Sequence, residues 1–236
     1  LDVNDRVLRK IVTGLDTPNN GIPSETGFVI TPASEIMAVL CLSESLDELR
    51  QKIDDMLLGF TFAGNGFTTK DLGVTGAITA LLKDAIQPNL VQTLEGTPAM
   101  IHGGPFANIA HGCNSLMATK TALQFGDYVV TEAGFASDLG AEKFFNIKCR
   151  KAGLQPAMSV LVATSQALKL SGGATEKTMM LPDKETLKKG LRNLEKHISI
   201  LKSFGQRVLV SLNKYHFDTE EELAYLRGWC AERDVH

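Results

Sequence analysis

Apolar runs and amphipathic segments alternate through the second half of this chain. Residues 127–131, 158–164 and 208–212 are almost continuously apolar or β-branched. Helical periodicity lies between and after these runs, and it predicts helices at about 107–125, 140–152, 184–204 and 219–233. Strands buried on both faces and joined by helices are typical of a parallel sheet. The pattern therefore predicts an α/β fold with a doubly wound, mainly parallel sheet.

The first half is less regular and mixes short elements. Apolar residues at helical spacing predict helices over the ranges 2–13, 32–42, 43–57 and 72–86. The second of these begins at Pro32, and Ser43 is the predicted N-cap of the third. Short strands are expected at 28–31, 89–94 and 98–101, a loop at 14–26 and a turn at 64–66. This half predicts a second α/β unit.

Composition and charge narrow the class of protein. The chain has 236 residues, 44% hydrophobic and 22% charged, which suits one large or two small globular domains. A formal net charge of −3 gives no electrostatic case for a nucleic acid or an anionic membrane as partner. No apolar run reaches the ~20 residues of a membrane span. The four cysteines contain no Cys-x-x-Cys pair, which predicts reduced thiols in the cytoplasm rather than disulfides or a structural zinc.

The two ends suggest a longer protein. Residue 1 is Leu rather than a start Met, and the sequence enters a helical pattern at once. At the other end, Val235 and His236 resemble the first step of another strand. We expect the chain to be a piece of a larger polypeptide.

The segment 97–115 carries the densest chemistry. A short apolar run, 98–101, predicts a buried strand, and the residues at 102–105 are His, Gly, Gly and Pro before the predicted helix. Glycines permit unusual backbone angles, and Pro105 suits the first turn of a helix. Free N–H groups at a helix start attract phosphate or carboxylate. The segment is thus either an anion-binding turn or a tight turn whose polar groups are internally satisfied.

Further polar residues follow the predicted strands. Glu132 and Asp138 come after the first strand, and Asn213 comes directly after the third. Ligands of open parallel sheets bind beyond the carboxyl ends of the strands, so we expect these residues and His102 to line one cleft. Glu132 either has a functional role, in which it orients a ligand or binds a metal ion or its water, or it merely caps a helix or pairs with a lysine. The Asn213-Lys214 pair resembles a GTPase base-reading element but lacks its Asp, since residue 216 is His.

Histidines, cations and cysteines complete the candidate chemistry. His102 and His111 are nine residues apart, whereas a zinc pair on one helix face needs a spacing near three to five. A phosphate contact or a proton-sharing role suits His111 better. On the 141–150 helix, Lys148 shares a side with Phe144 and can face the cleft. Cys113 and Cys149 are expected to be inert small hydrophobes, because no base is placed beside either.

Several strings of the sequence resemble one enzyme family. The sequence HGGPFANIAHG at 102–112 resembles, nearly letter for letter, a signature of formate–tetrahydrofolate ligases. VTEAGF at 130–135, with Asp138 shortly after, and AEKFFNIKCR at 141–150 resemble the same family closely. The similarity extends over essentially all 236 residues. The chain is therefore identified as resembling the central part of such a ligase.

The resemblance implies an activity. Members activate formate with ATP to formyl phosphate, which N10 of tetrahydrofolate attacks to give 10-formyltetrahydrofolate, ADP and phosphate. It also implies Mg²⁺, a monovalent cation, a homo-oligomer (a tetramer) and a cytoplasmic location. The catalytic residues expected from it are His111, Glu132 and Lys148, with Arg150 as a second candidate cation. The residues expected to bind substrate or nucleotide are His102, Gly103, Gly104, Pro105, Phe106, Asn108, Phe135, Asp138 and Asn213, and no residue is assigned as a metal ligand.

The resemblance also implies a domain division. Residues 1–115 correspond to part of an inserted second domain, 116–217 to the later strands and helices of a P-loop NTPase-like nucleotide domain, and 218–236 to the start of a third domain. The family's phosphate loop, Gly-x-x-x-x-Gly-Lys-[Ser/Thr], is absent from these 236 residues. In the family it lies upstream, so we expect this piece to be inactive alone.

Two other interpretations stay open. Gln166 and Ser171 stand where the family usually has Arg and His or Asn, which allows a divergent or non-catalytic paralogue that acts as a binding or assembly subunit. An ATP-dependent ligase of the dethiobiotin-synthetase type would share the doubly wound sheet but not the HGGPF string.

Overall fold

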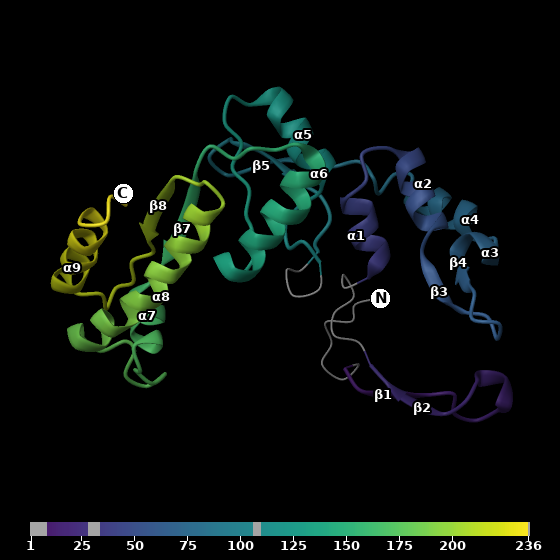
Figure 1. Ribbon diagram of the computed structural model, residues 1–236, viewed down its shortest axis with the longest axis horizontal. Coiled ribbons are helices and arrows are strands. Elements are labelled where there is room, and N and C mark those ends of the chain that lie inside the picture. The colour runs from purple at the N-terminus through teal and green to yellow at the C-terminus, as the bar shows by residue number, and fades with distance from the viewer. Residues whose placement is uncertain (1–8, 28–33, 106–109, 236) are drawn as a thin grey trace.

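The elements lie along an arch (Figure 1). The computed structural model describes residues 9–27, 34–105 and 110–235. The antiparallel hairpin of β1 (Ile11–Thr13) and β2 (Ser24–Thr26), with the 3₁₀ turn η2 (Pro18–Asn20) between them, lies near one end. The α/β unit that contains the last helix lies at the other end. In the part of the chain described, no helix is both long and apolar enough to cross a membrane.

The C-terminal unit is a parallel β-α-β arrangement. Strands β7 (Ser159–Ala163) and β8 (Val208–Leu212) pair in parallel, in register from Ser159 opposite Val208. Helices α7 (Ser165–Ser171) and α8 (Lys184–Ser203) connect them, and α9 (Glu220–Ala231) follows β8. The strands expected at 158–164 and 208–212, and the helices expected at 184–204 and 219–233, are thus confirmed.

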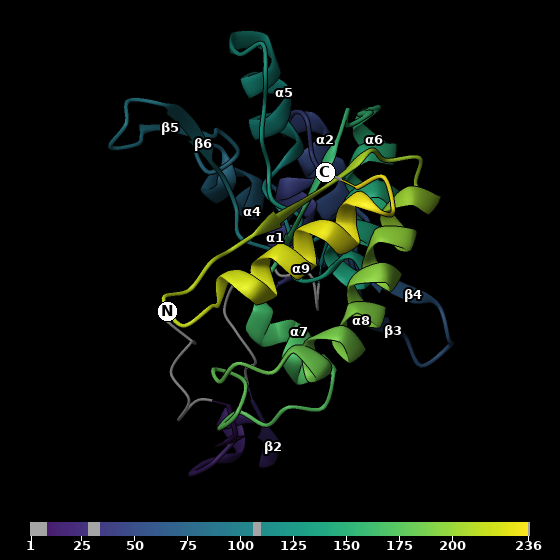
Figure 2. The same ribbon diagram turned by 90° about the vertical axis from the view of Figure 1, so that its left-hand side faces the viewer.

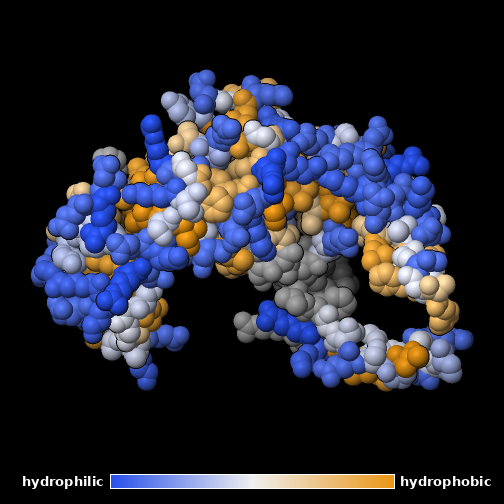
Figure 3. Space-filling model, viewed as in Figure 1, coloured by the Kyte–Doolittle hydropathy of each residue, from blue (hydrophilic) through white to orange (hydrophobic). Residues whose placement is uncertain are grey.

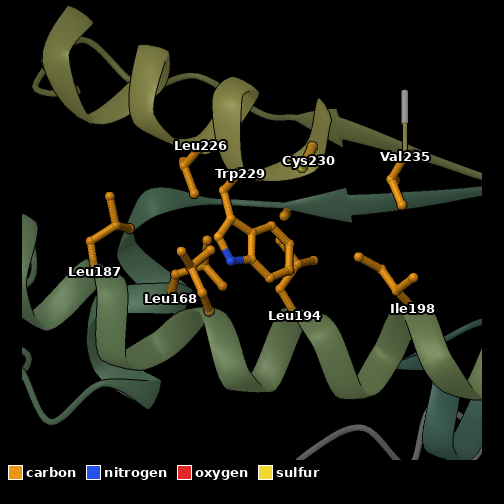
Figure 4. Packing of buried hydrophobic residues seen from close by; sticks show 10 residues of the cluster. Leu168, Leu187, Leu194, Ile198, Leu226, Trp229, Cys230 and Val235 are labelled. Carbon is orange, nitrogen blue, oxygen red and sulfur yellow. The ribbon is translucent and has the colours of Figure 1, made fainter. Parts of the chain in front are cut away.

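A continuous apolar core holds this unit together. Figure 2 shows α9 lying alongside α8, and Figure 4 shows the side chains that fill the space between these helices. Trp229 points from α9 toward α8, near Leu168 and Leu194. The spacing of residues in α8 explains this packing. Its leucines recur on one side of the helix and are buried, while its lysines lie on the outer side.

Two glycines allow α7 and α8 to touch backbone to backbone. A Cβ on Gly190 would lie 1.8 Å from the carbonyl oxygen of Leu168. A Cβ on Gly172 would lie 1.9 Å from the carbonyl oxygen of Thr186. Neither position has room for a side chain, so the close helix contact depends on both glycines.

Within this unit, a buried ion pair joins α7 to α9. Lys169 Nζ lies 3.2 Å from Glu222 Oε1, and both side chains are almost fully buried. Glu222 also accepts the backbone N–H of Asp183 at 3.0 Å, and Lys169 donates to the carbonyl of Leu181 at 3.0 Å. Because each charge has further hydrogen-bond partners, the pair tolerates burial.

The middle of the chain corrects a predicted helix start. Helix α5 (Leu116–Phe125) begins at Leu116 rather than near 107, because the Ser115 hydroxyl accepts the Ala118 N–H at 2.9 Å and caps it. Pro105 therefore does not open this helix. The helix expected at 140–152 is confirmed but begins earlier, and most of it consists of π turns, with η3 at Ser137–Ala141, η4 at Phe144–Cys149 and α6 at Arg150–Ala152.

The N-terminal part packs small helices around a separate apolar cluster. It contains Leu40, Cys41, Leu49, Ile53 and Ile86. The elements are α1 (Glu35–Cys41), α2 (Leu46–Asp54), β3 (Leu57–Phe60), β4 (Gly66–Thr68), α3 (Thr69–Leu72), α4 (Thr75–Leu82), β5 (Asn89–Gln92) and β6 (Pro98–Ile101). β3 pairs with β4 and β5 with β6, both antiparallel, and the turn expected at 64–66 lies between β3 and β4.

Three details of this part differ from the sequence prediction. Ser45, not Ser43, caps α2, because the Ser43 hydroxyl donates instead to the carbonyl of Val39 at 2.6 Å. The strand at 98–101 is exposed or half-buried rather than buried, and it lies in a two-stranded hairpin with β5. The end of the helix expected at 2–13 is not helical, since residues 9 and 10 form a bend and residues 11–13 form the strand β1. Residues 2–8 and the strand expected at 28–31 lie outside the described residues.

The main correction concerns the doubly wound sheet that the sequence predicts, because the described residues do not form one. Within the described ranges the chain forms two-stranded sheets, and only β7 and β8 pair in parallel. Residues 127–131 form no strand there, and Tyr128 and Val130 are 93% and 94% exposed. A strand needs a neighbour to bond its N–H and C=O groups, and these residues pair with none. Apolar residues accordingly gather on the visible surface in several places (Figure 3), and Val160 and Val162 of β7 are also exposed.

The glycine contact between α7 and α8 can be tested by substitution in the complete polypeptide. We expect Gly190→Ala to lower the free energy of unfolding by about 3 kcal/mol, because the new methyl group forces the two backbones apart. Chemical denaturation measures the change. Gly228→Ala on α9 is the matched control, since nothing lies within 4 Å of its Cβ position and alanine favours a helix by about 1 kcal/mol. Equal effects of both substitutions would contradict the close contact.

Candidate functional site

His102 fixes the loop that follows β6. Its ring is buried, with Nδ1 2.6 Å from the Ser115 hydroxyl and Nε2 2.7 Å from the carbonyl oxygen of Ala85. A carbonyl only accepts, so Nε2 carries the proton and, in the neutral ring, Nδ1 accepts from Ser115. Both ring nitrogens are thereby used inside the protein. His102 joins the end of the α4 region to the cap of α5, as a satisfied core histidine does.

The two glycines after His102 differ in their surroundings. Gly103 has φ +67°, and a Cβ there would lie 2.1 Å from Cys41 Sγ. Gly104 donates its N–H to the Cys41 thiol, and nothing lies within 4 Å of its own Cβ position. Gly103 thus seats the loop on α1, whereas Gly104 has an open side. Pro105 is buried next to them, and the candidate residues Phe106 and Asn108 lie outside the described residues.

His111 is buried without a partner. Its side chain is 1% exposed, and neither ring nitrogen has a hydrogen bond within the described structure. Burial lowers the pKa of His111 to about 4, and the charges of Lys148 and Lys143 contribute in the same direction. The imidazole is therefore neutral near pH 7. An unpartnered buried polar group costs about 1–3 kcal/mol, and such groups are found where a ligand or water completes them.

Lys148 places a positive charge in the same interior. Its side chain is fully buried, and Nζ donates to Asn114 Oδ1 at 2.8 Å. The ammonium also lies 5.6 Å from the centroid of the Phe144 ring and contacts the Cys113 thiol. Burial lowers the pKa of Lys148. The residue belongs to the π-helical segment η4, and π turns are frequent at functional sites.

The thiols around Lys148 are uncharged. Burial raises the pKa of Cys41 and of Cys149 to about 11, and it also raises the pKa of Cys113. Protonated thiols are poor nucleophiles, so the cysteines provide packing around the ammonium rather than reactive groups.

The loop that carries Glu132 lies against His111 and its neighbours. Gly134 donates its N–H to the carbonyl of Gly112 at 2.9 Å, which holds the two segments side by side. Glu132 is exposed, and its charge acts on the Cys113 thiol. The exposed carboxylate of Glu132 is thus on a loop beside the segment that carries the neutral imidazole of His111, near the buried ammonium of Lys148. These three groups can bind an anion and exchange a proton with it.

The remaining candidates lie on the same loop or farther away. Phe135 is 64% exposed and has φ +66°, an uncommon angle for a residue with a side chain. Asp138 is exposed in the first turn of η3. Asn213 follows β8, its backbone N–H donates to Ala163 at 2.9 Å, and its side chain is exposed. Among the described residues, no hydrogen bond connects Asn213 with His102 or His111, so the single edge expected from the sequence is only partly assembled.

Three residues of this site were not predicted from the sequence. Asn114 holds Lys148, Ser115 holds His102, and Cys41 lies against Gly103 and accepts from the Gly104 N–H. Ser115 carried a recognisable signal, because Ser directly before an apolar helical run is a common N-cap. Cys41 carried none, since it is far away in the sequence. No group of three or more metal-ligating side chains occurs in the described ranges.

The glycine pair generates a test on the ligand-free complete protein. We expect Gly103→Ala to lower the melting temperature strongly, since it combines a strained φ with a collision at Cys41, a cost of about 2 kcal/mol or more. Gly104→Ala is the matched control and should change it little, because its Cβ would meet nothing. Thermal unfolding of both variants measures the difference, and a stable Gly103→Ala protein would contradict the loop geometry.

His111 generates a pH test. Its folded pKa of about 4 lies below the ordinary 6.5, so the unfolded chain binds the proton more readily between these values. The free energy of unfolding should therefore fall as the pH drops from about 6.5 to 4, by on the order of 3 kcal/mol from this residue. We expect His111→Gln to flatten that part of the stability profile. His216→Gln, the same change at an exposed histidine, should leave it as steep as before.

Comparison with known proteins identifies the family. The chain matches the family described as formate–tetrahydrofolate ligase over residues 1–236. It is 63% identical over 235 residues to the formate–tetrahydrofolate ligase of Bacteroides thetaiotaomicron, 61% to that of Parabacteroides distasonis and 56% to that of Paracoccus denitrificans. Each alignment covers 100% of this chain but 42% of the relative, so the chain spans less than half the length of the curated relatives it matches. The family resemblance expected from the HGGPF string is thus confirmed, and the chain belongs to the formate–tetrahydrofolate ligase family.

Proposed function

We propose that this chain is the central part of an ATP-dependent ligase that joins formate to tetrahydrofolate. The reaction passes through formyl phosphate and yields 10-formyltetrahydrofolate, ADP and phosphate. The observation that carries the proposal is the buried, neutral His111, which has no partner among the described residues and on which the charge of Lys148 acts. These two groups lie under a loop whose sequence and whole-chain context match the ligase family.

Lys148 supplies the positive charge that phosphoryl transfer requires. Its ammonium is fixed by Asn114 in a water-poor interior, where a charge acts more strongly on a neighbouring anion than it does in water. In this role Lys148 stabilises the negative charge that develops on formyl phosphate and on the leaving phosphate.

His111 is suited to take the proton that N10 loses. Burial keeps its ring in the basic form at neutral pH, and both nitrogens are available to a substrate. Glu132, at the surface of the same site, orients the substrate or accepts the proton from His111. His102 acts through the loop, because its own nitrogens bond Ser115 and Ala85.

The loop after β6 is the proposed substrate-binding and nucleotide-binding element. Gly104 lets an anion approach the backbone closely, and Gly103 and Pro105 fix the conformation of the loop on either side of it. Phe106 and Asn108 continue it, and Phe135, Asp138 and Asn213 complete the proposed set of contacts. Mg²⁺ would arrive with ATP, and the exposed carboxylates of Glu132 and Asp138 are the oxygen donors that this ion prefers.

The rest of the proposal concerns the whole protein. Residues 116–217 would supply later elements of a P-loop NTPase-like domain, with 1–115 in an inserted domain and 218–236 at the start of a third. The exposed apolar residues at 128–130 and on β7 support this, since further strands would cover them. A monovalent cation, a tetrameric assembly and a cytoplasmic location belong to the same proposal. The four free, buried cysteines suit a reducing compartment.

A non-catalytic paralogue is the second candidate, on the strength of Gln166 and Ser171. Both lie on α7, and the Ser171 hydroxyl donates to the carbonyl of Ala167 in its own helix at 2.9 Å. If the family's side chains at these positions contact substrate, this protein lacks those contacts.

Turnover decides between the two candidates. The complete polypeptide should form 10-formyltetrahydrofolate from ATP, formate and tetrahydrofolate, whereas the 236-residue piece alone should not. We expect His111→Ala and Glu132→Ala in the complete enzyme to lower kcat at least about 100-fold with only a modest change in melting temperature. Glu142→Ala, at an exposed position on the neighbouring helix, is the control. An inactive complete protein that still binds nucleotide would favour the paralogue.

A further inference from the structure

Asn114 forms three hydrogen bonds inside the candidate site. Its side-chain oxygen accepts from Lys148 Nζ at 2.8 Å and from the Thr119 hydroxyl at 3.1 Å. Its side-chain nitrogen donates to the carbonyl of Met100 in β6 at 3.4 Å. One amide therefore connects the strand before the HGGPF loop, the first turns of α5 and the π-helical segment η4.

These partners fix the orientation of the amide. An ammonium can only donate and a carbonyl can only accept. Turning the Asn114 amide over would place its NH₂ against Lys148 and its oxygen against the carbonyl of Met100, so both contacts would become repulsive. The side-chain oxygen of Asn114 is thus held toward the ammonium.

The other groups around Lys148 show why its hydrogen bond to Asn114 matters. Cys41 of α1, Cys113 of the loop before α5 and Cys149 of its own helix surround it as uncharged thiols. His111 is neutral, and Lys143 and Lys148 both act on its ring. Glu132 is a carboxylate whose charge acts on this cluster, through Cys113 and from an exposed position. Among the described residues, Asn114 supplies the only oxygen recorded as an acceptor for Nζ.

We propose that Asn114 is a positioning residue that holds the Lys148 ammonium beside His111 without neutralising it. A carboxylate in its place would form an ion pair and cancel the charge offered to an anionic substrate. An apolar residue would leave the ammonium without an oxygen acceptor in a buried site. A neutral amide binds the ammonium and leaves its full charge available. The inference rests on the proposed function, in which Lys148 stabilises a phosphoryl group.

Two substitutions of Asn114 in the complete enzyme should act in opposite directions on Lys148. Asn114→Asp keeps the shape and adds a negative charge, so the pKa of Lys148 rises. Asn114→Leu removes the acceptor, so the pKa falls. Because the charged form is the functional one, activity declines as the pH rises through this pKa. The alkaline limb of the kcat/KM profile should therefore move up for Asn114→Asp and down for Asn114→Leu, with kcat/KM near pH 7.5 lowered roughly tenfold or more in both.

A second readout does not depend on catalysis. The ¹³Cε resonance of Lys148, assigned by its absence from the Lys148→Arg spectrum, reports the same titration in labelled complete protein without substrates. Thr119→Val is the matched comparison, since it removes a hydrogen bond from Asn114 without touching Lys148. It should lower the melting temperature while leaving the lysine titration in place.

The outcomes are distinct. Opposite movements of the Lys148 titration and of the alkaline limb support the positioning role. Unchanged titration in both Asn114 variants, with only a lower melting temperature, overturns it and leaves Asn114 as a packing residue. If the complete protein makes no 10-formyltetrahydrofolate, the proposed function fails, and the resonance still decides whether Asn114 governs Lys148.

Discussion

Burial of the Lys148 ammonium is the constraint around which the middle of this structure is arranged. A charge removed from water needs hydrogen-bond partners or a counter-charge. Here the immediate partners are uncharged: the Asn114 oxygen, the thiol of Cys113 and the face of Phe144. The result is a positive charge that is bound but not neutralised. Such a charge is available to an anion that enters the site.

The same burial determines the state of His111. Its ring cannot easily accept a proton next to an ammonium in a water-poor interior, so it stays neutral at ordinary pH. Neither of its nitrogens has a partner among the described residues, and an unpartnered buried polar group lowers stability. His102 shows the contrasting case a few residues earlier, since Ser115 and Ala85 occupy both of its nitrogens. His102 thus holds the loop in place, whereas His111 has no such contact among the described residues.

The C-terminal unit and the middle of the chain differ in how well their apolar residues are covered. The unit of α7, α8, α9 and the two parallel strands has its own core and its own buried ion pair. By contrast, the apolar residues near 128–130 pair with no strand among the described residues and are exposed. The chain spans 42% of the length of its relatives. A strand pattern alone does not make a strand, because each strand needs a neighbour for its N–H and C=O groups.

The sequence by itself determined the local elements and the family. Periodicity located α8, α9, β7 and β8 nearly to their ends, because one buried side recurs at a regular spacing in each. The segment 102–112 identified the family, because the characteristic residues are consecutive in the sequence and can be recognised without a structure. Only the tertiary structure decided that α5 begins after Ser115, that residues 127–131 form no strand here, and that Asn114 and Cys41 belong to the site. Caps, strand pairing and buried contacts depend on which partners reach a residue from elsewhere in the chain, and no local pattern records those partners.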